Sequence, residues 1–406
     1  MELCRRATVI SHVSKSSLVS ALALVAALAG CATVKDVGLR PLYVESDLDG
    51  TFEVRLDVAY RSDPEAHPQK HRLDLFLPHR AGFPLLAFVH GGSFENGDKG
   101  VSLAGLDIYG NIGRFYAARG VGVALINYRL QPEVHWPSQV DDVARAVAWL
   151  ARHQEELGGD GRLFLSGHSA GAWLVSRVAL DRDLLERPGV DLAGVAGVIS
   201  VSGSGFDMTD EQTWEMLGGP FSEAEWAERF DPGREWDAEG WKSAASIVPL
   251  VRPEAPPFLI VCTSRELEAL QRQNRLFHRA LGEAGVPSHF EVVGTDSHRR
   301  MALAMSHPDR LLPQLVLDFV SGGAAELAAA WSARAEPGDE GRAALARATR
   351  GDRFEPDPFE PDDLVGPPAA AAGSRWLSEQ SYGALDGPVG GDQADGVDWQ
   401  PPHEER

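Results

Sequence analysis

The chain has 406 residues, of which 44% are hydrophobic and 24% are charged, a composition typical of globular proteins. Its formal net charge of -21 at pH 7 argues against nucleic-acid binding, which needs clustered Lys and Arg, and against electrostatic attachment to anionic lipid. The three cysteines, Cys4, Cys31 and Cys262, are too few for a disulfide framework. Cys262 lies in an apolar run, so we expect a buried and inert thiol there.

The N-terminus has the pattern of a bacterial export signal. Basic residues precede an apolar stretch from Leu18 to Ala29, which suits a signal-peptide core but is too short to span a bilayer core of ~30 Å as a helix. The stretch ends in LAGC, which resembles the bacterial lipobox, where cleavage precedes the cysteine and its sulfur carries a diacylglyceryl group. The alternative is a plain secretory signal in which Cys31 is incidental.

The resemblance divides the N-terminus into a lipoprotein signal peptide at 1–30 and an anchor with its linker at 31–50. Two or three acyl chains, at about 0.8 kcal/mol per buried methylene, would hold the protein stably at a membrane. Ala32 follows the cysteine, where an Asp would resemble an inner-membrane retention signal. We therefore expect a protein of the bacterial cell envelope, anchored in the outer membrane through Cys31 and facing the periplasm.

Residues 51–322 alternate strand-like and helix-like segments. The first two, FEVRLDVAY and HRLDLFLP, alternate with period two and predict an antiparallel hairpin. Six later apolar segments predict buried strands: LLAFVHGG, VGVALINYRL, RLFLSGHSAG, AGVAGVISVSG, PFLIVCTS and HFEVVG. Between them, 137–157 and 266–284 have helical patterns. This order predicts an α/β domain with a mostly parallel, twisted sheet and helices on both faces.

Two regions break this alternation. Residues 206–245 are acidic and carry Trp214, Trp226, Trp236 and Trp241. They lie between strands on the side where loops shape an active site, which predicts a short lid or a pocket wall. The alternative is a surface excursion that the tryptophans hold in place. The acidic segment 335–406, rich in Gly, Pro and Ala, is expected to be disordered, because it cannot bury enough apolar surface to offset its ordering entropy.

The strongest local motif is GHSAG, with Ser169 at its centre. An apolar strand precedes it and a helical run follows it, which is the context of a nucleophile elbow. The glycines flank a strained turn at which side chains would collide with the adjacent strands. The motif alone occurs by chance in many chains, and its context makes Ser169 the candidate nucleophile.

A second motif, HGGS, follows the segment LLAFV. Acyl transfer passes through a tetrahedral oxyanion, which needs backbone N–H groups pointing at it. A glycine pair allows the main chain to approach that oxygen closely. We expect the oxyanion donors among Gly91, Gly92 and Ser93, together with Ala170 after the nucleophile. The alternative is an ordinary glycine turn after a strand.

A nucleophilic serine needs a base, and in this fold class the base comes last in the chain. His298, in GTDSH, directly follows the last predicted strand and is the candidate. His307 lies nearer the final helix, precedes Pro308 and is a weaker choice. Asp296 is only two residues from His298, so it is expected to shape the turn.

The base needs a carboxylate that orients its ring. This acid should follow the strand PPFLIVC, where Glu266 is the best placed and Glu268 is the alternative. A glutamate suffices, because the role requires only an orienting and stabilising negative charge.

Other chemistries are poorly supported. His67 and His71 are four residues apart, but Pro64 and Pro68 exclude a regular helix there, so we expect no zinc pair. The sequence contains neither a phosphate-binding P-loop nor a dinucleotide-binding GxGxxG motif. We expect no metal and no cofactor.

The run HGGSFENGDKG resembles the HGGxWxxGDK signature of a branch of the α/β-hydrolases that contains carboxylesterases, feruloyl esterases and kynurenine formamidase. NYRLQPEVHWPSQVDDVARAVAWL, GHSAGAWL, RELEALQRQN and GTDSH are similar to that branch in order and spacing, over 73–298. Phe94 stands where the branch often has Trp, which changes the packing of the pocket. The resemblance makes Asp98 and Asp142 structural residues that hold loops near the site.

Together these patterns predict a serine hydrolase similar to carboxylesterases, which cleaves a small-molecule ester through an acyl-enzyme on Ser169, with His298 and Glu266. One alternative is an arylformamidase-type amide hydrolase that uses the same residues. Another is a non-catalytic envelope protein that uses the fold to bind a partner, which would be inert toward esters.

Overall fold

The structure is a computed structural model that describes residues 43–46, 51–103, 106–185, 194–218, 220–231, 240–294 and 296–322. The predicted signal peptide, Cys31 and the acidic segment 335–406 lie outside these residues. All described residues belong to the compact unit Met1–Arg342. Within the described ranges, no helix is both long enough and apolar enough to span a bilayer.

Among the residues that the structure describes, eight strands form the main sheet, and their order across it is β1-β2-β6-β3-β7-β8-β9-β10. They are β1 Phe52–Ala59, β2 Arg72–Pro78, β3 Phe83–Val89, β6 Gly122–Ile126, β7 Gly159–His168, β8 Val195–Val201, β9 Phe258–Thr263 and β10 Ser288–Val293. β1 and β2 form the predicted antiparallel hairpin, β2 is also antiparallel to β6, and the remaining pairs are parallel. A separate pair, β4 Ser102–Leu103 and β5 Leu106–Asp107, is antiparallel.

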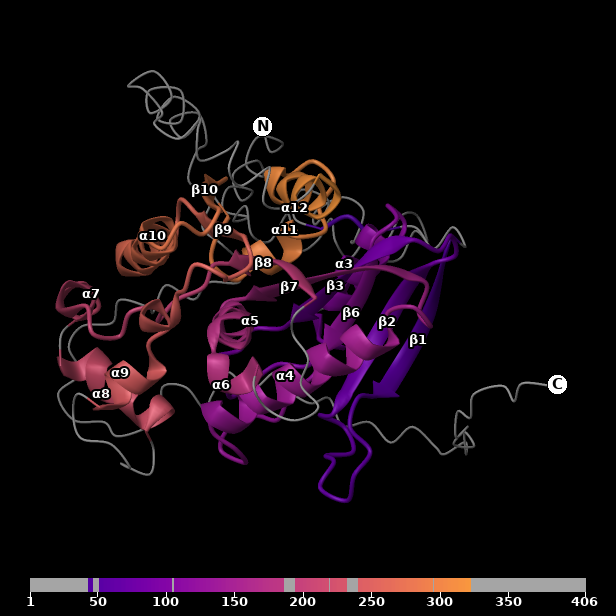
Figure 1. Ribbon diagram of the computed structural model, residues 1–406. Helices are drawn as coiled ribbons and strands as arrows, with labels where there is room; N and C mark the ends of the chain where they lie inside the picture. Colours follow the sequence, from indigo (N-terminus) through magenta and orange to yellow (C-terminus); the bar gives the residue numbers. More distant parts are fainter. Residues whose placement is uncertain are drawn as a thin grey trace, which may run out of the picture. The chain divides into compact units, whose positions relative to one another are not determined.

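Helices cover both faces of this sheet (Figure 1). The longer ones are α3 Ile108–Ala117, α4 Trp136–His153, α5 Ala170–Leu180, α8 Pro220–Phe230, α10 Glu268–Glu283 and α12 Leu311–Ser321. The shorter ones are α6 Arg182–Leu185, α7 Glu211–Met216, α9 Gly240–Ala245, the 3-10 helix η1 Val248–Leu250 and α11 Arg300–Ala304.

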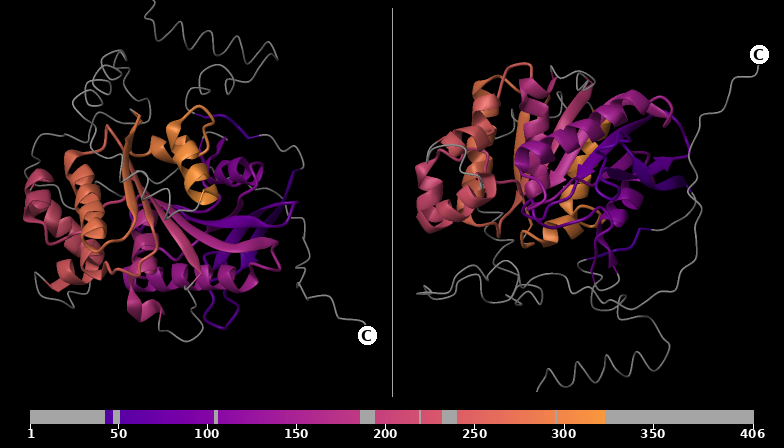
Figure 2. Two further views of the ribbon diagram at one scale, coloured as in Figure 1. Left: turned by 45° about the horizontal axis from the view of Figure 1, so that its top comes forward. Right: turned by 90° about the horizontal axis from the view of Figure 1, so that it is seen from below.

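The alternation of side chains along the strands divides the core between the two faces. Leu85, Ala87 and Val89 of β3 pack into one buried cluster with residues of α4, α5 and α10. Leu86 and Phe88 point to the opposite face, where they join a cluster with residues of α3, α11 and α12. The left view of Figure 2 shows helices on both sides of the sheet. The predicted mostly parallel sheet with helices on both faces is therefore confirmed.

The predicted helices are present, with different ends. The pattern over 137–157 corresponds to α4, which ends at His153. The pattern over 266–284 corresponds to α10, which begins at Glu268 rather than at Glu266. Glu266 therefore lies in the turn after β9, and the helix does not determine the direction of its side chain.

The winding of the chain reverses between β3 and β7. From β3 the chain passes to β6 on one side and then returns past β3 to β7 on the other side. Ligands of open α/β sheets bind at such a reversal, outside the carboxyl ends of the strands. Because Val89 pairs with Gly167 in the β3–β7 ladder, the HGGS and GHSAG motifs begin side by side at this edge.

Gly171 is required by this close approach. A Cβ at Gly171 would lie 2.1 Å from the carbonyl oxygen of Val89, which is backbone and cannot move aside easily. We expect Gly171→Ala to lower the free energy of unfolding by about 3 kcal/mol, as overpacking does. In the matched control Gly282→Ala, on α10, a Cβ would meet nothing within 4 Å. That change should stabilise the protein by ~0.5–1 kcal/mol, and urea unfolding of both variants measures the difference. Equal effects would contradict this prediction.

Candidate active site

Ser169 sits on a strained turn between β7 and α5. Its φ of 55° and ψ of -121° place it outside the conformations that a residue with a side chain ordinarily adopts. Its N–H donates a hydrogen bond to the carbonyl of Val201 at 2.9 Å, which ties the turn to β8. A Cβ at Gly167 would lie 2.3 Å from the backbone of Gly171, so glycine is required there. This is the elbow that the sequence predicted.

The structure brings Ser169, His298 and Glu266 together from three separate loops. Nε2 of His298 lies 2.9 Å from Oγ of Ser169, and Nδ1 of His298 is hydrogen-bonded to Oε1 of Glu266. The His298 side chain is 33% exposed and the Glu266 side chain only 1% exposed. The imidazole is therefore accessible from solvent, whereas the carboxylate is buried behind it. This is the arrangement of a nucleophile, a base and an orienting acid.

Glu266 is held in its charged form. Burial raises the pKa of this carboxyl, but the hydrogen bond and charge of His298 lower it by more, so the pKa lies below its usual value. The hydroxyl of Ser202 lowers the pKa of Glu266 by a smaller amount. Ser202 is buried, lies at the end of β8 and has a φ of 49°. An ionised carboxylate at Nδ1 favours the ring orientation and the imidazolium that acyl transfer requires.

Glu268, the alternative acid, and His307, the alternative base, lie elsewhere. Glu268 is exposed on the first turn of α10. Nδ1 of His307 accepts a hydrogen bond from the N–H of Asp309 at 3.2 Å and thus stabilises a local turn. The backbone carbonyl of Asp296 accepts a hydrogen bond from Thr263, and the predicted role of its side chain in the turn stays a prediction.

The glycine loop lies directly against the elbow. A Cβ at Gly91 would be 3.0 Å from Cβ of Ser169, so the main chain passes beside Ser169 with no room for a side chain. Gly92, Ser93 and Phe94 all have positive φ, at 122°, 55° and 67°. The carbonyl of Gly92 faces into the loop, where it accepts hydrogen bonds from two later N–H groups. The structure thus places Gly91 beside Ser169, and the role of Gly91, Gly92, Ser93 and Ala170 as oxyanion donors stays a prediction.

His90 stabilises this glycine loop through a hydrogen bond. Its Nδ1 donates a hydrogen bond to the carbonyl of Gly91 at 2.8 Å, and its ring stacks on Tyr128 with centroids 4.6 Å apart. Burial lowers the pKa of His90 to about 4, so the ring is uncharged at neutral pH. A neutral ring can remain buried without the desolvation penalty of a charge.

A row of aromatic rings lines the insertion at 206–245. Phe94 contacts Trp173 and Phe230, with ring centroids 5.5 Å and 5.3 Å apart. The rings of Trp226 and Phe230 stack at 5.8 Å, and Trp214 contacts Trp226 at 5.9 Å. Trp214 and Trp241 are buried, so these tryptophans attach α7, α8 and α9 to the domain. The loop residue Phe94 links this aromatic row to the HGGS motif, while Trp236 lies outside the described residues.

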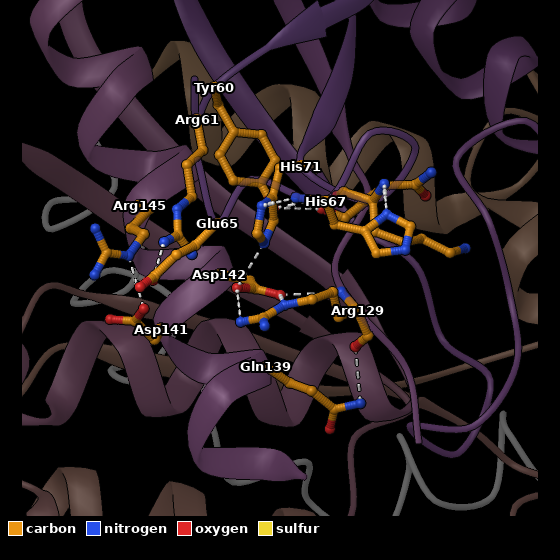
Figure 3. A network of polar contacts seen from close by, with 12 residues as sticks. Tyr60, Arg61, Glu65, His67, His71, Arg129, Gln139, Asp141, Asp142 and Arg145 are labelled. Atoms are coloured by element: carbon orange, nitrogen blue, oxygen red, sulfur yellow. Dashed lines mark hydrogen bonds and ion pairs between the residues drawn. The ribbon is translucent and has the colours of Figure 1, made fainter. Parts of the chain in front are cut away.

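Asp142 is the centre of a buried network that supports the site (Figure 3). Its carboxylate accepts hydrogen bonds from Nε2 of His71 at 2.9 Å and from the Arg129 guanidinium at 2.7 and 2.9 Å. Gln139 connects this network to the glycine loop, because its Nε2 donates both to the Arg129 carbonyl and to the Phe94 carbonyl. Loss of Asp142 would therefore loosen the loop as well as the core.

We expect Asp142→Asn to lower the free energy of unfolding at pH 7 by about 3 kcal/mol, because it leaves the Arg129 charge half-buried without its partner. Burial raises the pKa of Asp142, but its interactions with His71 and Arg129 lower it by a larger amount. The net pKa therefore lies below the usual value. The ionised group thus stabilises the fold above its unfolded pKa of about 3.9, and this contribution is lost as pH falls through the lower folded pKa.

The adjacent Asp141 provides the matched control. It pairs with Arg145 on the surface of α4 at 2.7 Å, visible beside the network in Figure 3. Asp141→Asn should change stability by less than about 1 kcal/mol, as surface ion pairs do. Urea unfolding measured from pH 7 down to acid pH should show the Asp142→Asn deficit shrinking below about pH 4. Equal losses in both variants, or a deficit independent of pH, would contradict the prediction.

The remaining sequence predictions concern Asp98 and two histidines. Asp98 accepts hydrogen bonds from Lys70 and from Asn127, at 2.9 and 2.7 Å, and so holds the loop after the glycine pair, as the resemblance implied. Nδ1 of His71 accepts a hydrogen bond from the N–H of His67, and the rings are engaged in loop structure. Among the described residues, no group of three or more His, Cys, Asp or Glu is placed to hold a metal ion.

Sequence reasoning missed two residues of the site, His168 and Ser202. His168 contacts His298, and Ser202 affects the pKa of Glu266; both partners are distant in the chain, so no local pattern pointed to these two residues. His168 is inside the GHSAG motif, yet the group that it contacts follows 130 residues later. Ser202 lies near the end of the predicted segment AGVAGVISVSG, and its positive φ marks it as unusual.

The sequence also matches known proteins. Residues 73–281, just over half of the chain, match the BD-FAE family model. Esterase LipQ of Mycobacterium tuberculosis (strain ATCC 25618 / H37Rv) is 31% identical over 198 residues, which are 48% of this chain and 46% of LipQ. Carboxylesterase NlhH of Mycobacterium tuberculosis (strain CDC 1551 / Oshkosh) is 34% identical over 108 residues, 26% of this chain and 32% of NlhH. The chain thus spans less than half the length of these curated relatives.

Solved structures have the same architecture. A truncated carbohydrate esterase from gut microbiota matches with a TM-score of 0.54 at 19% identity, over 68% of this chain and 99% of that one. Esterase B from Lactobacillus rhamnosis (HN001) matches with a TM-score of 0.54 at 18% identity, over 83% of this chain and 98% of that one. At such identities the likeness concerns the fold, and it confirms the predicted α/β-hydrolase fold.

Proposed function

Because the chain belongs to the BD-FAE family and has the α/β-hydrolase fold, we propose that it is a carboxylic ester hydrolase with Ser169 as its nucleophile. The relatives LipQ and NlhH are named as esterases, which favours an ester over the amide of the arylformamidase alternative. The substrate would be a small-molecule ester. Comparing turnover of short p-nitrophenyl esters with that of N-formylkynurenine distinguishes an esterase from an arylformamidase. Preference for the formyl amide would contradict this choice.

The proposed reaction passes through an acyl-enzyme. Nε2 of His298 takes the proton of the Ser169 hydroxyl while Oγ attacks the ester carbonyl carbon. The resulting oxyanion is stabilised by backbone N–H groups among Gly91, Gly92, Ser93 and Ala170. His298 then gives its proton to the leaving alcohol as the ester C–O bond breaks. Water repeats the sequence on the acyl-enzyme, releasing the carboxylic acid and restoring Ser169.

Glu266 serves this cycle without exchanging a proton. Its carboxylate accepts the Nδ1–H of His298, which leaves Nε2 as the atom without a proton, directed at Ser169. The negative charge also stabilises the imidazolium that forms in each half of the reaction. The low pKa of Glu266 keeps this charge in place at neutral pH.

The observation that carries this proposal is the 2.9 Å separation between Oγ of Ser169 and Nε2 of His298. An activated serine reacts with fluorophosphonates, so an active-site fluorophosphonate probe should label the wild-type protein. Ser169→Ala should not be labelled, whereas the inert envelope-protein alternative predicts that neither protein is labelled. Labelling of both proteins would place the nucleophile elsewhere.

We further propose that Cys31 carries the lipid that anchors the protein in the bacterial outer membrane, facing the periplasm. What supports this is the LAGC pattern and the absence of Asp after the cysteine. Tyr43 is attached to the domain, since its hydroxyl donates to the Asp107 carbonyl at 3.3 Å. The chain between Cys31 and Tyr43 can reach at most about 40 Å, so the domain would stay close to the bilayer.

Incorporation of labelled palmitate tests this attachment. The wild-type protein should carry the label and fractionate with outer membranes. Cys31→Ser should be unlabelled, and Cys262→Ser, which removes a buried thiol, should be labelled like the wild type. A wild-type protein without label would overturn the anchor and leave the proposed esterase unaffected.

A further inference from the structure

The residue before the nucleophile, His168, contacts the backbone of the base. Its Nε2 lies 2.8 Å from the carbonyl oxygen of His298, and the two imidazole rings are 5.1 Å apart. The His168 ring is only 5% exposed. Its other nitrogen faces the glycine loop, since a Cβ at Gly91 would lie 3.2 Å from Nδ1. His168 is therefore placed between the elbow, the base and the predicted oxyanion loop.

The contact with a carbonyl determines where the ring proton resides. A carbonyl oxygen only accepts hydrogen bonds, so Nε2 of His168 must be the donor and carry the proton. Burial, together with a smaller effect of the nearby His298, lowers the pKa of His168 to about 4. The ring is therefore uncharged at neutral pH and has no proton on Nδ1. His90 has the opposite tautomer, because its Nδ1 donates to the Gly91 carbonyl.

The loop of His298 needs such an attachment because of the strand order. The glycine loop follows β3, which pairs directly with β7, so the ladder itself positions that loop beside Ser169. His298 follows β10, and β8 and β9 lie between β10 and β7. The carboxyl ends of β7 and β10 are thus separated by three strand spacings of about 4.8 Å each. Strand pairing alone leaves the base and the nucleophile far apart.

Two hydrogen bonds to backbone carbonyls of this loop lead away from the elbow. The Asp296 carbonyl accepts a hydrogen bond from Thr263 on β9. The Ser297 carbonyl accepts one from the N–H of Met301 on α11, at 3.1 Å. The hydrogen bond of His168 runs toward the elbow instead. It links the elbow to the backbone of His298, whose side chain must contact Ser169. A small shift there matters, since a misplacement of 1 Å in an active site can cost about 100-fold in rate.

We propose that His168 is a positioning residue, whose Nε2–H holds the backbone of His298 against the nucleophile elbow and so sets the distance between base and nucleophile. The proposal rests on the proposed esterase function, because the distance matters only if His298 serves Ser169. His168 takes no proton from the substrate and contacts no reacting atom. Its effect is transmitted through the backbone of the base.

Two substitutions separate the hydrogen bond from the volume of the ring. His168→Gln keeps an N–H donor at a reach similar to that of Nε2. His168→Phe keeps a planar ring of similar size and removes the donor. With p-nitrophenyl acetate, we expect His168→Phe to lower kcat by about 10- to 100-fold with KM changed by less than about threefold. His168→Gln should recover most of that loss.

A purely structural role predicts another pattern. If His168 only fills space, His168→Phe should have nearly wild-type kcat and His168→Gln should be the worse variant. Either that order or equal losses in both variants would overturn the proposal. The melting temperature of each variant shows whether a loss of activity follows a loss of folded protein.

Nitrogen-15 NMR of the histidines tests the proposal on the wild-type protein without any activity measurement. At neutral pH, the His168 signal, identified by its absence in His168→Gln, should show a protonated Nε2 and an unprotonated Nδ1. The reverse tautomer would overturn the proposal even if a variant failed to fold. Failure of the proposed function has a different signature, because the wild-type protein would then neither turn over esters nor react with the fluorophosphonate probe.

Discussion

Ser169→Ala should lower turnover of a short p-nitrophenyl ester by about 10⁶-fold, the loss typical of a serine nucleophile that acts with a base. Alanine removes the oxygen that attacks the carbonyl, and the 2.9 Å contact with His298 then has no proton to transfer. Some rate above the uncatalysed reaction should persist, because the glycine loop can still stabilise an oxyanion formed by water. Steady-state kinetics of the purified full-length protein measures the loss.

Ser138→Ala is a suitable control for this substitution. Ser138 lies on α4, away from the elbow, and its change removes a hydroxyl of the same kind. Its turnover should equal that of the wild type, and circular dichroism should show that both variants are folded. A folded Ser169→Ala protein that keeps even about a tenth of the wild-type turnover would show that another group is the nucleophile.

Glu266→Gln should lower kcat by about 10⁴-fold while the protein stays folded. The amide is nearly isosteric with the carboxylate, but it carries no charge and can present an N–H group to Nδ1 of His298. The ring would then adopt the wrong tautomer, or lose the charge that stabilises its protonated form. The side chain is almost completely buried, so solvent cannot replace the missing acceptor.

Glu268→Gln is the matched control for Glu266→Gln. It is the same substitution two residues later in the chain, at an exposed position of α10, and its kcat should be within about twofold of the wild type. A large loss in Glu268→Gln with little change in Glu266→Gln would assign the acid to the other carboxylate. A similar loss in both would indicate damage to the turn that carries them.

The pH dependence of stability offers a second measurement on the same pair. The pKa of Glu266 is lowered in the folded state, so its charge contributes stability above its unfolded pKa of about 4.3 and loses it as pH falls through the lower folded value. Glu266→Gln should therefore flatten the decline in stability below about pH 4, relative to Glu268→Gln.

Local conformation was predictable from sequence wherever a short, continuous segment determines it. In the elbow, a Cβ at Gly167 would meet the backbone of Gly171, and in the glycine loop a Cβ at Gly92 would meet that of Asn96. The apolar strands were predictable for a similar reason, since both sheet faces are buried and each strand must be apolar along its length. The hairpin of β1 and β2 followed from the period-two alternation of both segments.

The choice between Glu266 and Glu268 required the tertiary structure. Both residues follow the same strand, and the helical pattern over 266–284 included both. Because α10 begins at Glu268, the side chain of Glu266 is directed from a turn rather than from a helix. A difference of one or two residues at a helix start is below what periodicity can resolve, yet it decides which carboxylate reaches His298.

The sequence by itself determined the fold class, the turn that presents Ser169 and the candidate base His298, because glycine spacing and strand periodicity act within a few residues of each other. Only the tertiary structure decided which acid meets the base, how His168 reaches the His298 carbonyl and how Asp142 joins His71 to Arg129. Those contacts connect residues far apart in the chain, and their distances follow from strand order and packing rather than from any local pattern.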